Sequence, residues 1–187
     1  MDLAPTILAV AGVTPTTMQG RSFLRTERDA VFAEANWHDF AQFTRAVRTD
    51  RFLLVRNFYN DKPLWNSVDS IQSGTWTGML EMRSAGRLTA AQAAIFVEPR
   101  PEEELYDLEK DPQSLKSVAG DPAYASTLAD LRKRLADWMK ETGDAVPAQR
   151  VPDGWTRDGI PLPHNQPWYD EWKRQGKSSL QAPKALR

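Results

Sequence analysis

Residues 103–139 read EELYDLEKDPQSLKSVAGDPAYASTLADLRKRLADWM, and the other parts of the chain can be placed around this pattern. In its second half the apolar residues recur at steps of three and four positions, which is the spacing of one face of an α-helix. The members of this stripe are Tyr124, Leu128, Leu131, Leu135, Trp138 and Met139. The spacing predicts an amphipathic helix over 123–142, whose apolar face needs a second layer to cover it.

The first half of the same stretch predicts a strand followed by a fixed connector. Residues 105–108 form a β-prone run that is too short to be stable alone, so we expect it to pair with strands from elsewhere in the chain. Each of the two Asp-Pro pairs disfavours helical geometry at its aspartate. We therefore expect a connector over 111–122, with Asp121 as the N-cap of the long helix.

Three more β-prone runs precede this stretch, and two of them are joined by the short link Thr49-Asp50-Arg51. Such a link predicts a hairpin. The three runs are 30–35, 43–48 and 52–58. Together with the run at 105–108 they predict a small antiparallel sheet of about four strands. The long helix is expected to pack on one face of this sheet, which makes the fold class α+β.

A short helix is expected at the amino end of the chain. Asp2 is a favourable N-cap and Gly12 a favourable end, which together predict a helix over 2–11. This helix is almost entirely apolar, so in a chain of this size it would have no partner large enough to bury it. We therefore expect the chain to be truncated at this end.

Two further segments lie outside the predicted sheet. Residues 61–101 form an insertion between strands, in which helices are expected over 75–82 and 89–96. After Gly143 the proline content rises, and 143–187 is expected to be an extended arm. Its tryptophans are expected to lie on the domain or on a neighbouring subunit. These tryptophans are Trp155, Trp168 and Trp172.

The composition excludes several classes of function. Among 187 residues, 41% are hydrophobic and the formal net charge is −1, so there is no excess of positive charge for nucleic acid or an anionic membrane. No apolar run approaches 18 residues, and no charged and then apolar leader follows Met1. A secretory signal is therefore expected only on a missing amino-terminal part. The absence of cysteine excludes disulfides, thiolate metal sites and a cysteine nucleophile.

The order of strand, two Asp-Pro pairs and long terminal helix resembles the C-terminal end of sulfatases, most of all the heparan N-sulfatase (sulfamidase, N-sulfoglucosamine sulfohydrolase) branch. DLAPTILAVAGV at 2–13 and MQGRSFL at 18–24 resemble the last helix of a sulfatase catalytic domain and its exit. The resemblance implies three parts. Residues 1–20 would end the catalytic domain, 21–142 would form the C-terminal domain, and 143–187 would be the arm.

Sulfatases use a formylglycine made within a C/S-x-P-x-R motif, and a calcium ion held by aspartates and an asparagine. The motif does not occur in these 187 residues. The resemblance therefore implies a hydrolase of sulfate esters or sulfamates of sulfated sugars, with formylglycine and calcium in a missing N-terminal domain. This chain would supply pocket rim and stability and would be inactive alone. Its expected partners are a sulfated carbohydrate, the missing domain and, as an open alternative, a second copy in a homodimer.

Family resemblance and side-chain chemistry together select four candidate substrate-binding residues. In the sulfamidase branch a histidine and an acid at the places of His38 and Asp39 face the sugar, and both can bond hydroxyl groups. Adjacent residues on an extended chain point in opposite directions, so no His-Asp dyad is expected. Arg45 and Arg48 are candidate sulfate contacts. The alternatives are a solvated turn for 38–39 and, for the arginines, a solvent face neutralised by Glu27, Asp29 and Asp50.

Two other classes of function stay open. Seven tryptophans and the proline-rich arm would suit a non-catalytic module that binds carbohydrate or contacts another subunit. The superfamily that sulfatases share with alkaline phosphatase also includes phosphoesterases and phosphonate hydrolases. Asn57 and Asn60 are additional polar groups that could contact sugar, although asparagine at a strand end is first of all a turn residue.

Overall fold

The computed structural model describes residues 2–14, 17–24, 27–64, 67–156 and 159–175. It contains a four-stranded antiparallel sheet in the order β1-β2-β3-β4, so each strand pairs with its neighbour in sequence. The strands are β1 (Val31–Trp37), β2 (Ala41–Arg48), β3 (Phe52–Asn57) and β4 (Glu103–Asp107). This confirms the predicted sheet and the predicted hairpin between β2 and β3, whose Thr49 N–H donates to Phe52 O at 2.9 Å.

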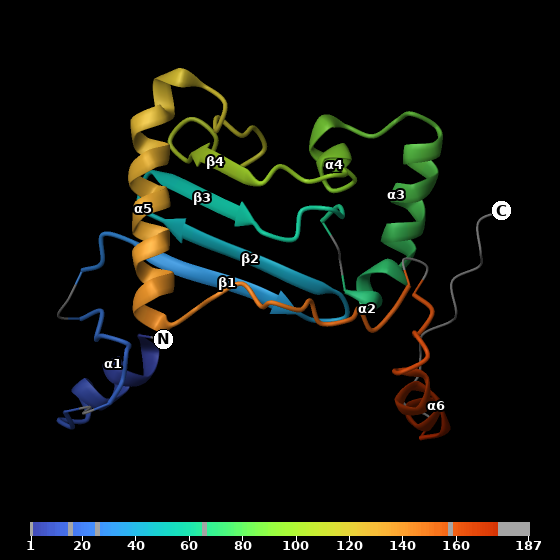
Figure 1. The fold of residues 1–187 in the computed structure, drawn as a ribbon, viewed down its shortest axis with the longest axis horizontal. Helices are drawn as coiled ribbons and strands as arrows, with labels where there is room; N and C mark the ends of the chain where they lie inside the picture. Colours follow the sequence, from blue (N-terminus) through green and yellow to red (C-terminus); the bar gives the residue numbers. More distant parts are fainter. Residues whose placement is uncertain (1, 15–16, 25–26, 65–66, 157–158, 176–187) are drawn as a thin grey trace.

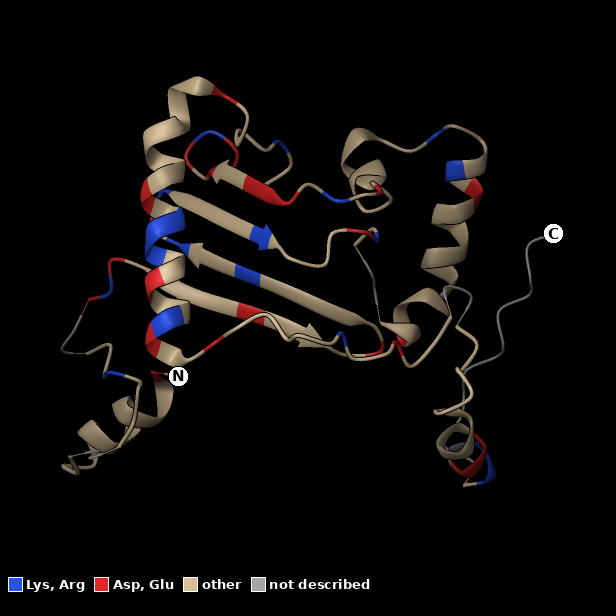
Figure 2. Cartoon of the chain, viewed as in Figure 1, with Lys and Arg blue, Asp and Glu red and all other residues tan. Residues whose placement is uncertain are grey.

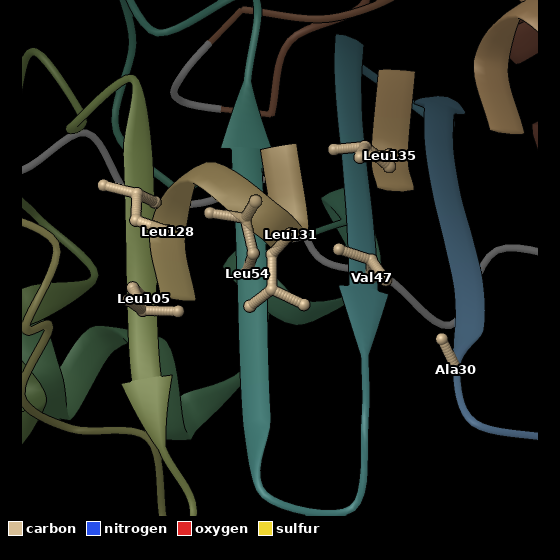
Figure 3. Close-up of a cluster of buried hydrophobic side chains, with 7 residues drawn as sticks. All are labelled: Ala30, Val47, Leu54, Leu105, Leu128, Leu131 and Leu135. Atoms are coloured by element: carbon tan, nitrogen blue, oxygen red, sulfur yellow. The ribbon is translucent and has the colours of Figure 1, made fainter. Parts of the chain in front are cut away.

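The long helix α5 (Ala125–Thr142) lies across one face of the sheet (Figure 1). Its buried leucines 128, 131 and 135 pack on one apolar residue from each strand region below, as Figure 3 shows. Those residues are Ala30, Val47, Leu54 and Leu105. The stripe read from the sequence is therefore the core of the fold, and the α+β class is confirmed.

Both ends of α5 are fixed as the local sequence requires. Asp121 accepts a hydrogen bond from the Ala123 N–H at 2.9 Å, at the start of the 3₁₀ turn η1 (Pro122–Tyr124) that leads into the helix. At the other end Gly143 adopts φ +68°, a left-handed conformation that residues with a Cβ rarely take. The outer face of α5 carries both basic and acidic residues (Figure 2), with Lys133 paired to Asp137 at 2.6 Å.

The described residues also form five shorter helices, three of which lie in the insertion at 61–101. They are α1 (Leu3–Val10), α2 (Val68–Ile71), α3 (Gly74–Ser84), α4 (Ala90–Ala94) and α6 (Gln166–Arg174). The predicted helices at 75–82 and 89–96 correspond to α3 and α4. Thr89 and Gln92 form a reciprocal capping box at the start of α4. Within the described residues, no helix is long and apolar enough to cross a membrane.

The segment after α5 differs from the expected extended arm. It returns along the β1 side of the sheet towards α2 (Figure 1) and then forms α6, which was not predicted. Trp155 and Tyr169 from this segment are buried in a second apolar cluster with Phe40, Val68 and Ile71. Trp168 is exposed on α6, and the side chain of Trp172 lies outside the described part. The arm is folded because its aromatic residues find an apolar surface at the β1–β2 turn.

Candidate functional site

His38 and Asp39 lie in the turn that joins β1 to β2, at the end of the sheet next to α2. The His38 Nδ1 atom is 2.9 Å from Asp39 Oδ2, so the two side chains form a pair. The expectation that they point in opposite directions was wrong, because these residues occupy a bend and not an extended strand. The His38 side chain is 70% exposed, whereas that of Asp39 is 18% exposed. The turn therefore presents the imidazole to solvent and holds the carboxylate beneath it.

Asp39 connects three segments that are distant in sequence. Its carboxylate accepts a hydrogen bond from the Val68 N–H at 2.7 Å, at the first residue of α2. Its backbone oxygen accepts from the Gly154 N–H at 2.8 Å. A Cβ at position 154 would lie 3.3 Å from that oxygen, so glycine permits the close approach. Asp39 thus positions the insertion and the returning arm against the turn that carries His38.

Asp153 and Lys62 complete this anchoring, and sequence reasoning did not identify either. Asp153 Oδ1 accepts from the Ala41 N–H at 2.8 Å, and its other oxygen forms an ion pair with Lys62. The Trp37 indole N–H donates to Pro152 O at 3.1 Å. The available signal was the turn-forming sequence Pro-Asp-Gly at 152–154, directly before a tryptophan. The imidazole of His38 therefore projects from a turn that is hydrogen-bonded to both neighbouring segments.

Arg45 is in a different environment from the one expected. It is only 1% exposed, and its guanidinium donates from Nε and Nη2 to the two oxygens of Asp144 at 2.5 and 2.7 Å. This ion pair lowers the pKa of Asp144. The guanidinium carbon also lies 3.7 Å from the ring centroid of Phe43. The interpretation that Arg45 lies on a solvent-exposed face was therefore wrong. Arg45 lies on the face of the sheet that α5 covers, and its partner Asp144 directly follows Gly143. A sulfate could contact Arg45 only if Asp144 moved away.

Arg48 lies at the opposite end of β2 from His38 and Asp39. It is exposed and lines a hollow of about 200 Å³ together with Arg28, Asp29 and Asp50. From Ala41, the first residue of β2, to Arg48 there are seven residue steps, which correspond to about 23 Å along a strand. Arg48 and the His38 turn therefore cannot contact the same sugar ring. Of the four candidates, only His38 and Asp39 are brought together. A role in substrate binding stays a prediction for all four.

The two asparagines that could contact sugar are both engaged within the protein. Asn57 is buried, and its amide donates to Pro101 O at 2.9 Å and to Glu104 Oε1 at 2.8 Å. Asn60 donates to Arg100 O at 3.1 Å. These bonds close the insertion by joining the end of β3 and the residues after it to the start of β4 and the residues before it.

Comparison with known proteins finds relatives that are considerably longer than this chain. No family model matches it. It is 35% identical over 151 residues to an ulvan-active sulfatase of Formosa agariphila, a match that covers 77% of this chain and 25% of that protein. It is 31% identical over 189 aligned positions to the human N-sulphoglucosamine sulphohydrolase, covering 91% of this chain and 37% of that protein. The chain thus spans well under half the length of these two relatives.

Solved structures share the same fold. A 2-O GAG sulfatase superimposes with a TM-score of 0.52 at 21% identity, over 81% of this chain and 27% of its own. A second protein, solved in complex with its substrate D-glucosamine-2-N,6-O-disulfate, gives a TM-score of 0.50 at 22% identity, over 78% of this chain and 24% of its own. At these identities the likeness concerns the fold. The predicted resemblance and the predicted architecture are both confirmed by these comparisons.

Proposed function

Because this chain is a homologue of sulfatases over most of its length, we propose that it forms the C-terminal part of a sulfatase-family hydrolase acting on sulfated sugars. The observation that carries the proposal is the agreement of sequence and fold. Two sulfatase relatives above 30% identity cover 77% and 91% of the chain, and the sheet with its covering helix is also found in solved sulfatase chains. The relatives are named for ulvan and N-sulphoglucosamine, so a sulfated polysaccharide is the substrate class that we assign.

The sulfur chemistry itself belongs, in this proposal, to a part of the enzyme outside these residues. The sequence has no C/S-x-P-x-R motif in which a formylglycine could form. In the described part of the chain, no three His, Cys, Asp or Glu side chains are grouped so that they could hold a metal ion. Since the described residues do not fit either group, we place formylglycine and calcium in the N-terminal part and derive no step through them.

In this proposal the chain contributes residues at the rim of the substrate pocket, where they contact the sugar. His38 is the exposed group of the anchored turn, and an imidazole can donate or accept a hydrogen bond to a ring hydroxyl or add positive charge near a sulfate. Asp39 acts through His38 by orienting the ring from Nδ1, and it also holds α2 and the arm. A rim residue fixed in this way recognises the sugar without touching the sulfur atom.

The proposal is tested by comparing the 187-residue chain with the product of the longer reading frame. The purified chain should not hydrolyse an aryl sulfate or N-sulfoglucosamine, with or without calcium. The upstream DNA should encode C-x-P-S-R or S-x-P-S-R, and the longer protein should release sulfate from a sulfated glucosamine. Turnover by the short chain that survives repurification would contradict the division of roles. An unrelated gene immediately upstream would contradict the proposed enzyme.

A further inference from the structure

A hollow of about 460 Å³ is lined by residues of α2, of α3 and of the link between them. Helix α2 lies next to the turn that carries His38 (Figure 1). The volume of the hollow falls within the range of small-molecule sites, roughly 300–1,000 Å³. The hollow is lined by Asp69, Ser70, Ser73, Thr75, Trp76 and Met79. Asp69 follows Val68, whose N–H is bound by Asp39, so the hollow is tied to the His38 turn by one hydrogen bond and one peptide step. Nothing in the proposed rim uses these residues.

Trp76 gives the hollow a fixed aromatic surface. It packs against the second apolar cluster and lies 5.2 Å from Phe96, ring centroid to centroid, at an interplanar angle of 32°. Its backbone N–H donates to the Ser73 hydroxyl at 3.2 Å, which fixes the start of α3. A tryptophan held in this way combines a large apolar area with a negative ring face. The polarised C–H bonds on one face of a pyranose ring suit such a surface.

Asp69 and Thr75 supply the polar part. Both are exposed, and within the described residues neither side chain makes a hydrogen bond or an ion pair. The Ser73 hydroxyl, in contrast, already donates to Ser70 O at 2.6 Å. A carboxylate only accepts hydrogen bonds at neutral pH, whereas a threonine hydroxyl donates and accepts. The two free groups therefore match the hydroxyls of a sugar that lies on Trp76.

The charge of the hollow selects which sugar ring can enter. Asp69 is negative, and none of the described residues that line the hollow is a lysine or arginine. A sulfate placed about 4 Å from this carboxylate in water would bind roughly fivefold more weakly for each unit of charge. A site built to hold sulfate would carry arginine or lysine in place of the acid.

We infer that this hollow is a subsite for an unsulfated, uncharged sugar ring of the glycan, lying beside the ring that meets His38. The inference deepens the proposed function and rests on it for the identity of the glycan as a sulfated polysaccharide. Trp76 stacks on the ring, Asp69 and Thr75 bind its hydroxyls, and Asp69 rejects sulfated rings. The enzyme would therefore favour sites where a sulfated unit has an unsulfated neighbour.

The test is a titration of the 187-residue chain by ¹H–¹⁵N NMR. The probes are a neutral N-acetylglucosamine disaccharide and its 6-O-sulfated counterpart. Shifts should gather at the Trp76 indole and at the amides of 69–79, and the neutral probe should bind about fivefold more tightly. Asp69→Asn should remove this preference. Thr75→Val should weaken the binding of the two probes by factors that are similar to each other. Glu81→Gln, an exposed change of the same charge type on α3 outside the hollow, should alter neither. These surface changes avoid the core packing that Trp76→Ala would disturb.

Equal affinity for the two probes, a preference that survives Asp69→Asn, or shifts located elsewhere would overturn the inference. Failure of the subsite inference can be distinguished from failure of the proposed hydrolase function. Sulfate release by the longer protein together with a silent hollow would reject the subsite and keep the hydrolase. Binding at the hollow without any sulfate release by the longer protein would reject the hydrolase and keep the subsite as a carbohydrate contact.

Discussion

Arg45 and Asp144 form a two-pronged ion pair inside the protein although 99 positions separate them in sequence. The pair joins the middle of β2 to the first residue beyond the left-handed Gly143, so it fixes the direction in which the chain leaves α5. From there the arm runs to Gly154 and the Asp39 backbone. Arg45, which the sequence suggests as a sulfate contact, therefore also helps to bring the arm to the His38 turn.

Removing the carboxylate of this pair should destabilise the protein. Asp144→Ala leaves a buried guanidinium without its partner, which typically costs about 3–5 kcal/mol. We expect about 3 kcal/mol, because Asp144 is partly exposed and Glu34 offers a second carboxylate 3.8 Å from Arg45. Urea unfolding measures the change. Asp137→Ala, in an exposed pair with Lys133, is the control and should cost less than about 1 kcal/mol. Equal losses in both variants would contradict a buried pair.

Asp107 should make stability depend on acid pH. The Arg51 guanidinium and the Tyr124 hydroxyl hold its pKa at about 2, below the ordinary value of 3.8. The unfolded chain therefore binds the proton more readily, so the stabilisation is complete above about pH 4 and is lost as the pH falls towards 2. Melting temperatures from pH 2 to 5 test this. Asp107→Asn should make the melting temperature depend less steeply on pH in that window. An unchanged slope would show that other carboxylates cause the dependence.

The stripe on α5 should behave as a packed core. Leu131→Ala or Leu135→Ala removes a buried side chain between the helix and the sheet, and such changes cost about 2–5 kcal/mol. Ser126→Ala on the exposed side of the same helix should change the free energy of unfolding by less than about 0.5 kcal/mol. Chemical denaturation of the three variants gives the comparison. A loss below about 1 kcal/mol for either leucine would mean that the stripe does not face the sheet.

Helix α1 should be the weakest helix of the isolated chain. Leu3, Ile7 and Val10 are exposed on it, so little apolar packing protects its amides. We expect rapid hydrogen exchange over 3–10 and association at high concentration. Ile7→Lys should lower the association measured by sedimentation without changing the midpoint of unfolding. Strong amide protection in a monomer would show instead that α1 is an integral part of this fold.

Local patterns predicted the architecture well because each depends on neighbours in sequence. The 3.6-residue spacing of Leu128, Leu131 and Leu135 needs no information from elsewhere, and the same holds for the short link that closes the β2–β3 hairpin. The Arg45–Asp144 pair and the Asp39–Gly154 contact join residues with no shared local pattern. Neither periodicity nor turn chemistry carries information about such pairs, so the buried state of Arg45 and the folded arm became visible only in three dimensions.

The two members of the His38–Asp39 pair differ in role. His38 is the candidate ligand contact, whereas Asp39 positions the neighbouring segments. The bend that brings the imidazole to the carboxylate depends on the residues that Asp39 binds in α2 and in the arm. Asp39→Ala should therefore leave the Val68 N–H without its acceptor and reduce stability as well as activity. His38→Ala, at an exposed side chain, is the sharper probe of function.

In the proposed longer enzyme, His38→Ala should lower kcat/KM on a sulfated glucosamine while leaving a small aryl sulfate almost unchanged, because in the proposed rim the imidazole contacts the sugar and not the sulfur. Loss of a hydrogen bond to a neutral hydroxyl predicts roughly a two- to tenfold decrease, and loss of a contact between imidazolium and sulfate up to about a hundredfold. Steady-state kinetics on both substrates measure the ratio, with Lys133→Ala on the outer face of α5 as the control. Equal loss on the two substrates would indicate a direct catalytic role or misfolding, which unfolding curves separate, and no loss on either would leave His38 as the solvated member of a turn.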